Sequence, residues 1–259
     1  LARELAAQGW RADLIVANNV LAHVPDINDF ARGFEILLKP DRVATFEFPH
    51  LMRMIEETQF DTIYHEHYSY LSLSAANRIF QQAGLEIFDV EEIPTHGGSL
   101  RVYAQKRATG RQPRTPAVDS LLQREAEAGM GTRSFYQGFQ AEADRIKYDF
   151  LSFLLRMKRE GRKVAAYGAA AKGNTLLNYA GVKRDLLSYV CDAAPSKQGK
   201  YLPGSRIPIL PPGALDENRP DIIVILPWNI AEEVVRQHGY ARQWGGRFAV
   251  AIPKMEIFS

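Results

Sequence analysis

The sequence predicts an α/β protein built from two Rossmann-like blocks that are joined by a helical middle. Each block contains short apolar runs of strand length that are separated by amphipathic stretches. Strands that alternate with helices are typical of a mostly parallel sheet with helices packed on its faces. A polar, proline-containing stretch, residues 108–117, separates the first block from the helical middle. We therefore expect three parts, with boundaries at 1–107, 108–161 and 162–259.

The first block contains the signals of four strands and two helices. Residues 13–19 (DLIVANN) form a nearly all-apolar run, which fits a buried parallel strand. A helix is expected to follow, with Asp26 as its N-cap and Lys39-Pro40 closing it, and a later helix is expected to stop at Gly84. The last two strands flank a turn and could pair antiparallel. The expected helices are 26–38 and 72–83, and the remaining expected strands are 42–48, 86–93 and 100–106.

The middle and the second block continue the same alternation. Two long helical stretches, about 118–128 and 132–160, are predicted for the middle. The second block begins with KVAAY, an apolar run of strand length, and its other strands have the same character. The expected strands are 163–167, 187–191, 221–226 and 247–252, and the expected helices are 172–179 and 230–238. This block is predicted to be a complete Rossmann-like domain.

Composition narrows the class of protein. The 259 residues include 32 basic and 30 acidic side chains, and the net charge of +2 gives no argument for binding nucleic acid or a membrane surface. The single cysteine, Cys191, excludes an internal disulfide and a cysteine-rich zinc site, so we expect a cytoplasmic protein. No apolar run approaches the roughly 20 residues that span a bilayer. The chain opens at Leu1, inside an amphipathic helical pattern, which predicts that it is a fragment.

The densest group of chemically useful side chains lies at residues 60–70 (FDTIYHEHYSY). Three tyrosines, two histidines and two carboxylates occur within these eleven residues. Histidine exchanges protons near neutral pH, a neighbouring carboxylate can fix its tautomer, and tyrosine can donate to a developing oxyanion. A polar loop with satisfied hydrogen bonds is the plainer alternative, but the density favours a catalytic role. His65 and His67 lack the four-residue spacing of a helical zinc motif, so we predict no metal.

A second group follows the strand 13–19. Asn18 and Asn19 stand at its carboxyl end, where ligands bind in open α/β sheets, and His23 is placed to reach a substrate. The asparagines can bond the polar groups of a cofactor, or they can simply cap the turn.

Two turns in the second block are candidate phosphate sites. Residues 167–175 (YGAAAKGNT) follow a strand and open a helix, so phosphate binding at the helix N-terminus is as probable as a turn chosen for packing. Asn174 stands where a P-loop requires lysine, which excludes a Walker NTPase. In residues 192–204, Lys197 and Lys200 could neutralise a diphosphate or belong to a solvated loop. Trp228 could stack on a base or sugar, or belong to the core.

Seven of these segments, in order, resemble the motifs of the sugar C-methyltransferases, a family that methylates a carbon of dTDP-linked 4-keto-deoxysugars. They are NNVLAHVPDINDF, EFPHL, QFDTIYHEHYSYLSL, PTHGGSLRVY, YGAAAKGNTLLNY, KQGKYLPGSRIPI and LPWNI. The resemblance implies an N-terminal zinc-binding module, a class I methyltransferase domain and a C-terminal α/β domain that helps to hold the nucleotide-sugar. The zinc module's cysteines and the glycine-rich turn for S-adenosylmethionine are absent from this chain. We therefore expect only part of the methyltransferase sheet, zinc only in the missing module, and little binding of S-adenosylmethionine by the fragment itself.

The resemblance also implies roles for individual residues. His67 would be the general base that removes a proton from the carbon next to the ketone, and Glu66 would orient it. Tyr64 and His23 would stabilise the enolate, and His65 would be structural. The cofactor-side residues are Ala17, Asn18 and Asn19. The substrate-side residues are Gly97, Gly98, Ser99, Gly168, Lys172, Asn174, Lys197, Lys200, Trp228 and Asn229.

Two other interpretations remain open at this point. The chain could be a fragment or paralogue that holds a nucleotide-sugar without catalysis, which the missing front end favours and the intact YHEH cluster opposes. A nucleotide-dependent oxidoreductase built on the second block ranks last, because that block has no dinucleotide fingerprint.

Overall fold

The chain folds into two compact units, and the computed structural model describes residues 1–258. The first unit consists of residues 1–56 and 65–138. The second consists of residues 57–64 and the chain from Phe139 onward. The short segment 57–64 thus packs with a unit whose remaining residues begin about 75 positions later. The chain leaves the first unit after α3 (Leu51–Glu56) and returns to it before α4 (Leu73–Gln82).

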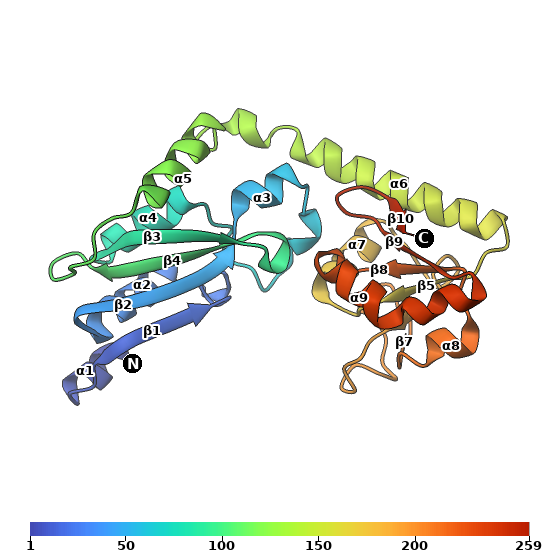
Figure 1. Ribbon diagram of the computed structural model, residues 1–259, viewed down its shortest axis with the longest axis horizontal. Coiled ribbons are helices and arrows are strands. Elements are labelled where there is room, and N and C mark those ends of the chain that lie inside the picture. The colour runs from blue at the N-terminus through green and yellow to red at the C-terminus, as the bar shows by residue number, and fades with distance from the viewer. Residues whose placement is uncertain (259) are drawn as a thin grey trace. The chain divides into compact units, whose positions relative to one another are not determined.

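The first unit is built on a four-stranded mixed sheet in the order β1-β2-β4-β3 (Figure 1). Strand β1 (Ala12–Asn18) is parallel to β2 (Leu38–Pro49), and β4 (Ser99–Lys106) is antiparallel to both β2 and β3 (Leu85–Ile93). The predicted antiparallel pairing of the last two strands is confirmed. The preceding helix ends at Leu37, next to the predicted end before Lys39-Pro40, but these two residues already lie within β2. Proline is tolerated there because Pro40 falls in the irregular stretch between Leu38 and Val43, where the pairing with β1 shifts register and β4 is not yet paired.

Helices pack on one face of this sheet and enclose its core. Helix α2 (Ile27–Leu37) begins as predicted, since the Asp26 side chain accepts a hydrogen bond from the Asp29 N–H. Phe34 of α2, Phe46 of β2 and Phe80 of α4 form a continuous stack, with ring centroids 4.5 and 4.4 Å apart. Helix α5 (Pro116–Glu127) adds Val118 and Leu121 to the same cluster. A short helix, α1 (Ala2–Ala7), packs against α2.

A buried polar network joins three elements of the first unit. The Glu125 carboxylate of α5 accepts hydrogen bonds from the Leu73 and Ser74 N–H groups at the start of α4, at 2.6 and 2.8 Å. It also lies 2.9 Å from the His50 Nε2, and both side chains are 1% exposed. Glu125 therefore satisfies N–H groups that have no partner inside helix α4.

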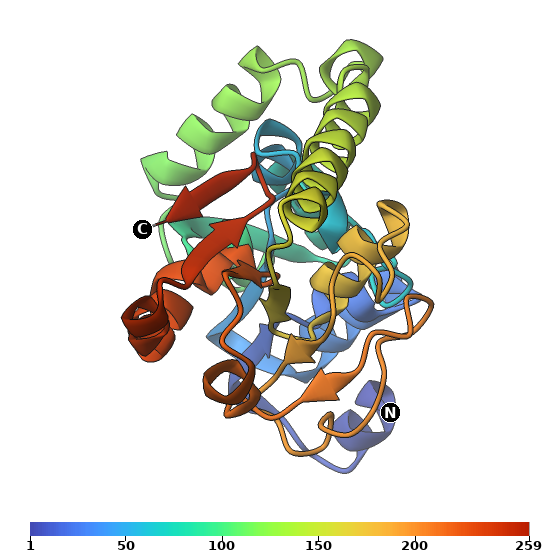
Figure 2. The ribbon, with the colours of Figure 1, turned by 90° about the vertical axis from the view of Figure 1, so that its right-hand side faces the viewer.

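The second unit is a doubly wound α/β domain with the strand order β10-β9-β8-β5-β6-β7 (Figure 2). All neighbouring strands are parallel except β10, which is antiparallel to β9. From β5 the chain proceeds to one side through β6 and β7 and then returns to the other side through β8 and β9. The switch point of a Rossmann-like sheet therefore lies between β5 and β8. The strands are β5 (Val164–Tyr167), β6 (Val190–Cys191), β7 (Ile209–Leu210), β8 (Ile222–Ile225), β9 (Arg247–Val250) and β10 (Glu256–Phe258).

Helices cover both faces of the second sheet. Successive residues of β5 and β8 alternate between two separate hydrophobic clusters, as side chains of a strand must. One cluster includes α6 (Phe139–Arg159) and α7 (Ala171–Tyr179), and the other includes α8 (Ala214–Asn218) and α9 (Ala231–His238). Phe60, from the segment 57–64, lies in the first cluster, and its ring centroid is 5.2 Å from that of Tyr179.

Several sequence-based expectations about elements were wrong. The helix expected from residue 132 begins only at Phe139, because Arg133–Tyr136 form a 3-10 helix that ends before Gly138. The strand expected at 187–191 is reduced to its last two residues. The short elements α3, β7, α8 and β10 were not predicted. Among residues 1–258 no helix has the length and hydropathy needed to span a membrane.

The outer edge of the first sheet makes a testable prediction. Strand β1 is an edge strand, and its Leu14 and Val16 side chains are 58% and 55% exposed. Exposed apolar edge strands pair with other chains, so Leu14→Lys combined with Val16→Thr should reduce self-association. Sedimentation velocity over a concentration series is the measurement. The matched control is Leu155→Lys on α6, a side chain that is 40% exposed. Equal effects of the two changes, or a wild-type chain that is monomeric throughout, would contradict the prediction.

Candidate active site

Two histidines meet beside the carboxyl end of β1 in the first unit. His23 ends the short 3-10 helix Leu21–His23, and its ring centroid lies 4.8 Å from that of His67 at an interplanar angle of 72°. The backbone after His67 is fixed to the same place, because the Tyr68 N–H donates to the Ala22 carbonyl at 2.8 Å. Both rings are half-buried. The structure therefore brings the side chains of two predicted catalytic residues, 44 positions apart in the sequence, next to each other at the sheet edge.

The other members of the YHEH cluster are placed less closely. Glu66 is exposed, and within the described chain it has neither a hydrogen bond nor an ion pair, so it does not hydrogen-bond to His67. His65 is also exposed. Tyr64 is half-buried and belongs by its contacts to the second unit, whereas His67 belongs to the first. Because three residues span at most about 10 Å, Tyr64 still stands within that distance of His67.

The asparagines after β1 take different environments. Asn18 is exposed at the end of the strand. Asn19 has φ 55°, and its N–H donates to the Glu47 carbonyl at 2.8 Å. The Asn19 Oδ1 is buried and has no hydrogen-bond partner within residues 1–258. Ala17 is 4% exposed and belongs to the core. An unpaired buried acceptor costs free energy, so the Asn19 amide is suited to accept a hydrogen bond from a ligand.

The THGGS turn is stabilised by its own hydrogen bonds. The Ser99 hydroxyl donates to the Thr95 carbonyl at 2.9 Å and is buried, so it is not presented to a ligand. Gly97 and Gly98 both have positive φ, and a Cβ on Gly98 would lie 2.9 Å from the Arg53 side chain. The Thr95 hydroxyl also donates to the buried Glu47 carboxylate, at 3.1 Å. The glycines thus serve the turn and its close packing.

In the second unit, the predicted residues after β5 and β8 converge at the switch point. Lys172 Nζ donates to Asn229 Oδ1 at 2.7 Å and lies 4.6 Å from the centre of the Trp228 ring. Gly168, at φ 92°, leaves no room for a side chain, because a Cβ would lie 2.4 Å from Pro227. The Asn174 Oδ1 is buried, and no hydrogen-bond partner is found for it in the described part of the chain. Several of the predicted residues therefore lie together at this edge, which makes it a candidate binding region.

Asp61 is the group at this edge that the sequence analysis did not assign. Its carboxylate is fully buried, and Oδ2 accepts a hydrogen bond from Trp228 Nε1 at 2.8 Å. Burial raises the pKa of the Asp61 carboxyl to about 6, against the opposing charge of Lys172 and the bond from Trp228. Burial likewise lowers the pKa of the Lys172 ammonium, and Asp61 opposes that shift. The two groups therefore influence each other's pKa, while the Lys172 ammonium donates its hydrogen bond to Asn229.

The two lysines of the 192–204 loop differ in their ion pairs and in their exposure to solvent. Lys197 Nζ pairs with the Asp192 carboxylate at 3.1 Å. That carboxylate also accepts the N–H groups of Ala169 and Ala194, at 2.7 and 2.8 Å. Although burial opposes the shift, these bonds hold the pKa of Asp192 below its ordinary value. Lys200 is exposed and has no ion pair with any described residue.

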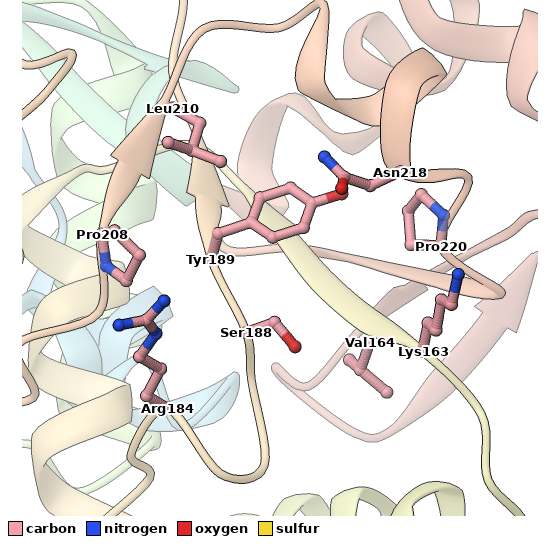
Figure 3. A pocket seen from close by; sticks show the side chains of 9 residues that line it. All are labelled: Lys163, Val164, Arg184, Ser188, Tyr189, Pro208, Leu210, Asn218 and Pro220. Atoms are coloured by element: carbon pink, nitrogen blue, oxygen red, sulfur yellow. The ribbon is translucent and has the colours of Figure 1, made fainter.

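A cavity of about 590 Å³ opens at the other edge of the second sheet (Figure 3). Lys163, Ser188 and Pro220 immediately precede β5, β6 and β8 or stand within two residues of them, so the cavity lies at the amino ends of the strands. None of the predicted site residues lines it. Within the described chain, no group of three or more histidine, cysteine, aspartate or glutamate side chains is arranged to hold a metal ion.

The residues that sequence reasoning missed are buried acids. Glu47, Glu125 and Asp61 are 5%, 1% and 0% exposed. Asp61 carried one signal, since it directly follows Phe60 in the densest motif of the chain. Glu125 lies in a helix that is rich in charged residues, so nothing local separates it from solvated glutamates.

Comparisons with known proteins match nearly the whole chain. Residues 94–253 match the family described as C-methyltransferase C-terminal domain, and residues 2–90 match a methyltransferase domain. The C-methyltransferase NovU of Streptomyces niveus is 36% identical over 256 residues, which are 99% of this chain and 61% of that protein. The chain therefore spans less than two thirds of the length of this relative.

Similar solved structures show much weaker likeness. A crystal structure of M1.HpyAVI is 11% identical, with 42% of this chain and 50% of that one covered and a TM-score of 0.27. A structure from work on the conversion of a disulfide bond into a thioacetal group in echinomycin biosynthesis is 14% identical, with 46% and 57% covered and a TM-score of 0.28. Scores this low carry no argument.

The buried Asp61 predicts a pH-dependent stability. An acid whose pKa is higher in the folded state destabilises the fold when ionised, and this cost disappears as the pH falls from above 6 toward 3.8. The difference corresponds to about 3 kcal/mol. Relative to Asp61→Asn, the wild-type chain should therefore gain about 2 kcal/mol of unfolding free energy between pH 8 and pH 4.5 in urea denaturation, and the remainder as the pH falls through 3.8. The control is Asp221→Asn, where the pKa is lowered by the Lys163 N–H and the dependence should have the opposite sign. Parallel pH curves for wild type and Asp61→Asn would contradict the prediction.

Proposed function

Because this chain belongs to the C-methyltransferase family, we propose that the protein methylates the carbon next to the ketone of a nucleotide-linked 4-keto-deoxysugar, with S-adenosylmethionine as the methyl donor. The observation that carries this proposal is the His23–His67 pair beside the carboxyl end of β1. It combines a group that can take a proton with a second imidazole at the edge where α/β sheets bind ligands. NovU, a C-methyltransferase by name, supports the reaction class.

The first unit offers polar groups for the cofactor. The unpaired Asn19 Oδ1 fits a ligand that presents an N–H or O–H group, and S-adenosylmethionine carries both. Asn18 and Asn19 would hold these polar groups next to His23. When bound, S-adenosylmethionine supplies an electrophilic methyl group. The residues of this chain then have two tasks, which are to remove a proton from the substrate carbon and to stabilise the charge that results.

Proton removal falls to His67. The C–H bond next to a ketone breaks with its electron pair moving into the carbonyl, which yields an enolate and a protonated imidazole. His23, 4.8 Å away between ring centroids, and Tyr64 would donate hydrogen bonds to the enolate oxygen. The enolate carbon would then take the methyl group as the methyl–sulfur bond of the donor breaks, and the bonding electron pair would remain on sulfur, which leaves as a neutral thioether. Glu66, which is exposed, would act on His67 only if substrate binding brought it closer.

The second unit would hold the nucleotide-sugar at its switch point. Trp228 presents a ring beside Lys172 and Asn229, which suits stacking with polar contacts at the rim. Gly168 and Asn174 complete the region after β5. Since Lys197 pairs with Asp192 and Lys172 donates to Asn229, Lys200 is the lysine most available to a diphosphate. The partner proposed for this unit is therefore the dTDP portion of the substrate.

The proposed reaction predicts a large effect of removing the base. His67→Ala should slow solvent hydrogen exchange at the carbon next to the ketone by roughly a hundredfold or more, the scale of general base catalysis. The measurement is deuterium uptake into a dTDP-4-keto-deoxysugar, followed by mass spectrometry with no methyl donor present. His65→Ala is the matched control and should exchange at the wild-type rate.

Two outcomes would overturn this assignment. Unchanged exchange in His67→Ala would show that His67 is not the base. Loss of exchange in His65→Ala alone would show that the other histidine is. If the wild-type chain binds the nucleotide-sugar and catalyses no exchange, the protein is a binding module.

A further inference from the structure

Asp61 is a buried titratable group that the proposed reaction does not use. It belongs to the 3-10 helix Phe60–Thr62, which packs against α7 of the second unit. Phe60 lies in the core of that unit, and Asp61 bonds to Trp228 from the loop after β8. Phe60 and Asp61 thus give the segment 57–64 an apolar and a polar contact with the second unit, although its neighbours in sequence belong to the first unit.

The chain is fixed again a few residues later. The N–H groups of Tyr68 and Ser69 both donate to the Ala22 carbonyl, at 2.8 and 3.3 Å, next to His23. Between Thr62 and His67 the chain has no regular secondary structure. The YHEH cluster is therefore a short span held at one end by the second unit and at the other by the first.

Stability alone does not account for an acid at this position. The Asp61 Oδ1 is buried without a hydrogen-bond partner among residues 1–258, and the pKa of the carboxyl shows that ionising it there is unfavourable. Replacing buried charged groups by apolar side chains of similar volume often stabilises a fold. The carboxylate makes the attachment directional, because a buried acceptor must keep the Trp228 indole N–H within hydrogen-bonding distance, whereas an apolar side chain could pack in several ways.

We propose that Asp61 is a positioning residue, whose hydrogen bond from Trp228 fixes the segment 57–64 in the second unit and so places Tyr64 for the enolate. This inference rests on the proposed function only for the role of Tyr64. The fixing of the segment is independent of any reaction and is tested without one.

The first experiment measures the anchor itself. Hydrogen–deuterium exchange with mass spectrometry is compared for wild type, Asp61→Ala and Asp61→Asn, and the indole N–H signals are followed by NMR. Asp61→Ala should raise exchange at least tenfold within residues 57–64 and expose the Trp228 indole. Asp61→Asn retains an acceptor and should preserve protection. Trp244, whose indole donates to the Pro220 carbonyl in the same unit, is the internal reference and should not change.

The second experiment measures the consequence for Tyr64. In deuterium uptake by the keto-sugar, Asp61→Ala and Tyr64→Phe should each lower kcat, and the double variant should be no slower than the slower single one. Asp61→Asn should restore most of the rate. Trp228→Phe removes the hydrogen-bond donor and keeps the Asp61 carboxylate. It should have the same effect as Asp61→Ala in both experiments. This variant keeps the inference testable if Asp61→Ala does not fold.

Specific results would overturn the inference. Unchanged exchange in residues 57–64 of Asp61→Ala and Trp228→Phe would show that the bond fixes nothing. Multiplicative effects of Asp61→Ala and Tyr64→Phe would show that Tyr64 acts independently of the anchor. If no variant, including wild type, catalyses uptake, the proposed function fails while the exchange measurement still decides whether Asp61 holds the segment.

Discussion

The hydrogen bond between Asp61 and Trp228 is the contact on which the arrangement of the candidate site depends. It joins residues 167 positions apart and recruits an eight-residue segment from the middle of one unit into the other. Phe60 supplies the apolar part of this attachment through the α6–α7 side of the second sheet. Tyr64 follows Asp61 by three residues, so under our proposal a carboxylate with no part in the reaction would set the position of a residue that stabilises the enolate.

A second buried acid has a corresponding place in the first unit. Glu125 reaches from α5 to the start of α4, just after the YHEH cluster, and to His50, just after β2. Truncating such a group leaves several buried donors without an acceptor, which makes the loss larger than one hydrogen bond. The YHEH cluster is thus followed by helix α4, and hydrogen bonds to Glu125 of α5 fix the N-terminus of that helix. Rigid support on both sides is what a site needs when groups must be held within a fraction of an ångström.

The sequence predicted the two blocks and most elements because their signals are local. Asp26 and Ser72 bond to the next turn of their own helices, and β5 and β8 read as continuous apolar runs. The expectations failed at irregular stretches. Pro40 lies in β2 at the place where the pairing with β1 shifts register, and residues 133–136 form a 3-10 helix instead of joining α6.

The site residues likewise divide into those that the sequence reveals and those that only the folded structure reveals. His23 and His67 are chemically conspicuous, and their motifs placed both in the candidate site, where the structure brings them together. Asp61 and Glu125 look like ordinary acids in a sequence, and only burial and distant partners show their importance. Glu66 illustrates the converse, since its position beside His67 in sequence predicted a contact that the structure does not contain.

Asp192 stands 24 residues after Gly168, past the end of the strand next to β5, where dinucleotide-binding sheets place the acid that recognises a ribose 2′-hydroxyl. Here its oxygens already accept two backbone N–H groups and the Lys197 ammonium, so the carboxylate braces the loops that follow β5 and β6. Of its roughly four lone-pair sites, most are therefore used within the protein. The Asp192 carboxylate therefore has little capacity left to accept a hydrogen bond from a ribose 2′-hydroxyl.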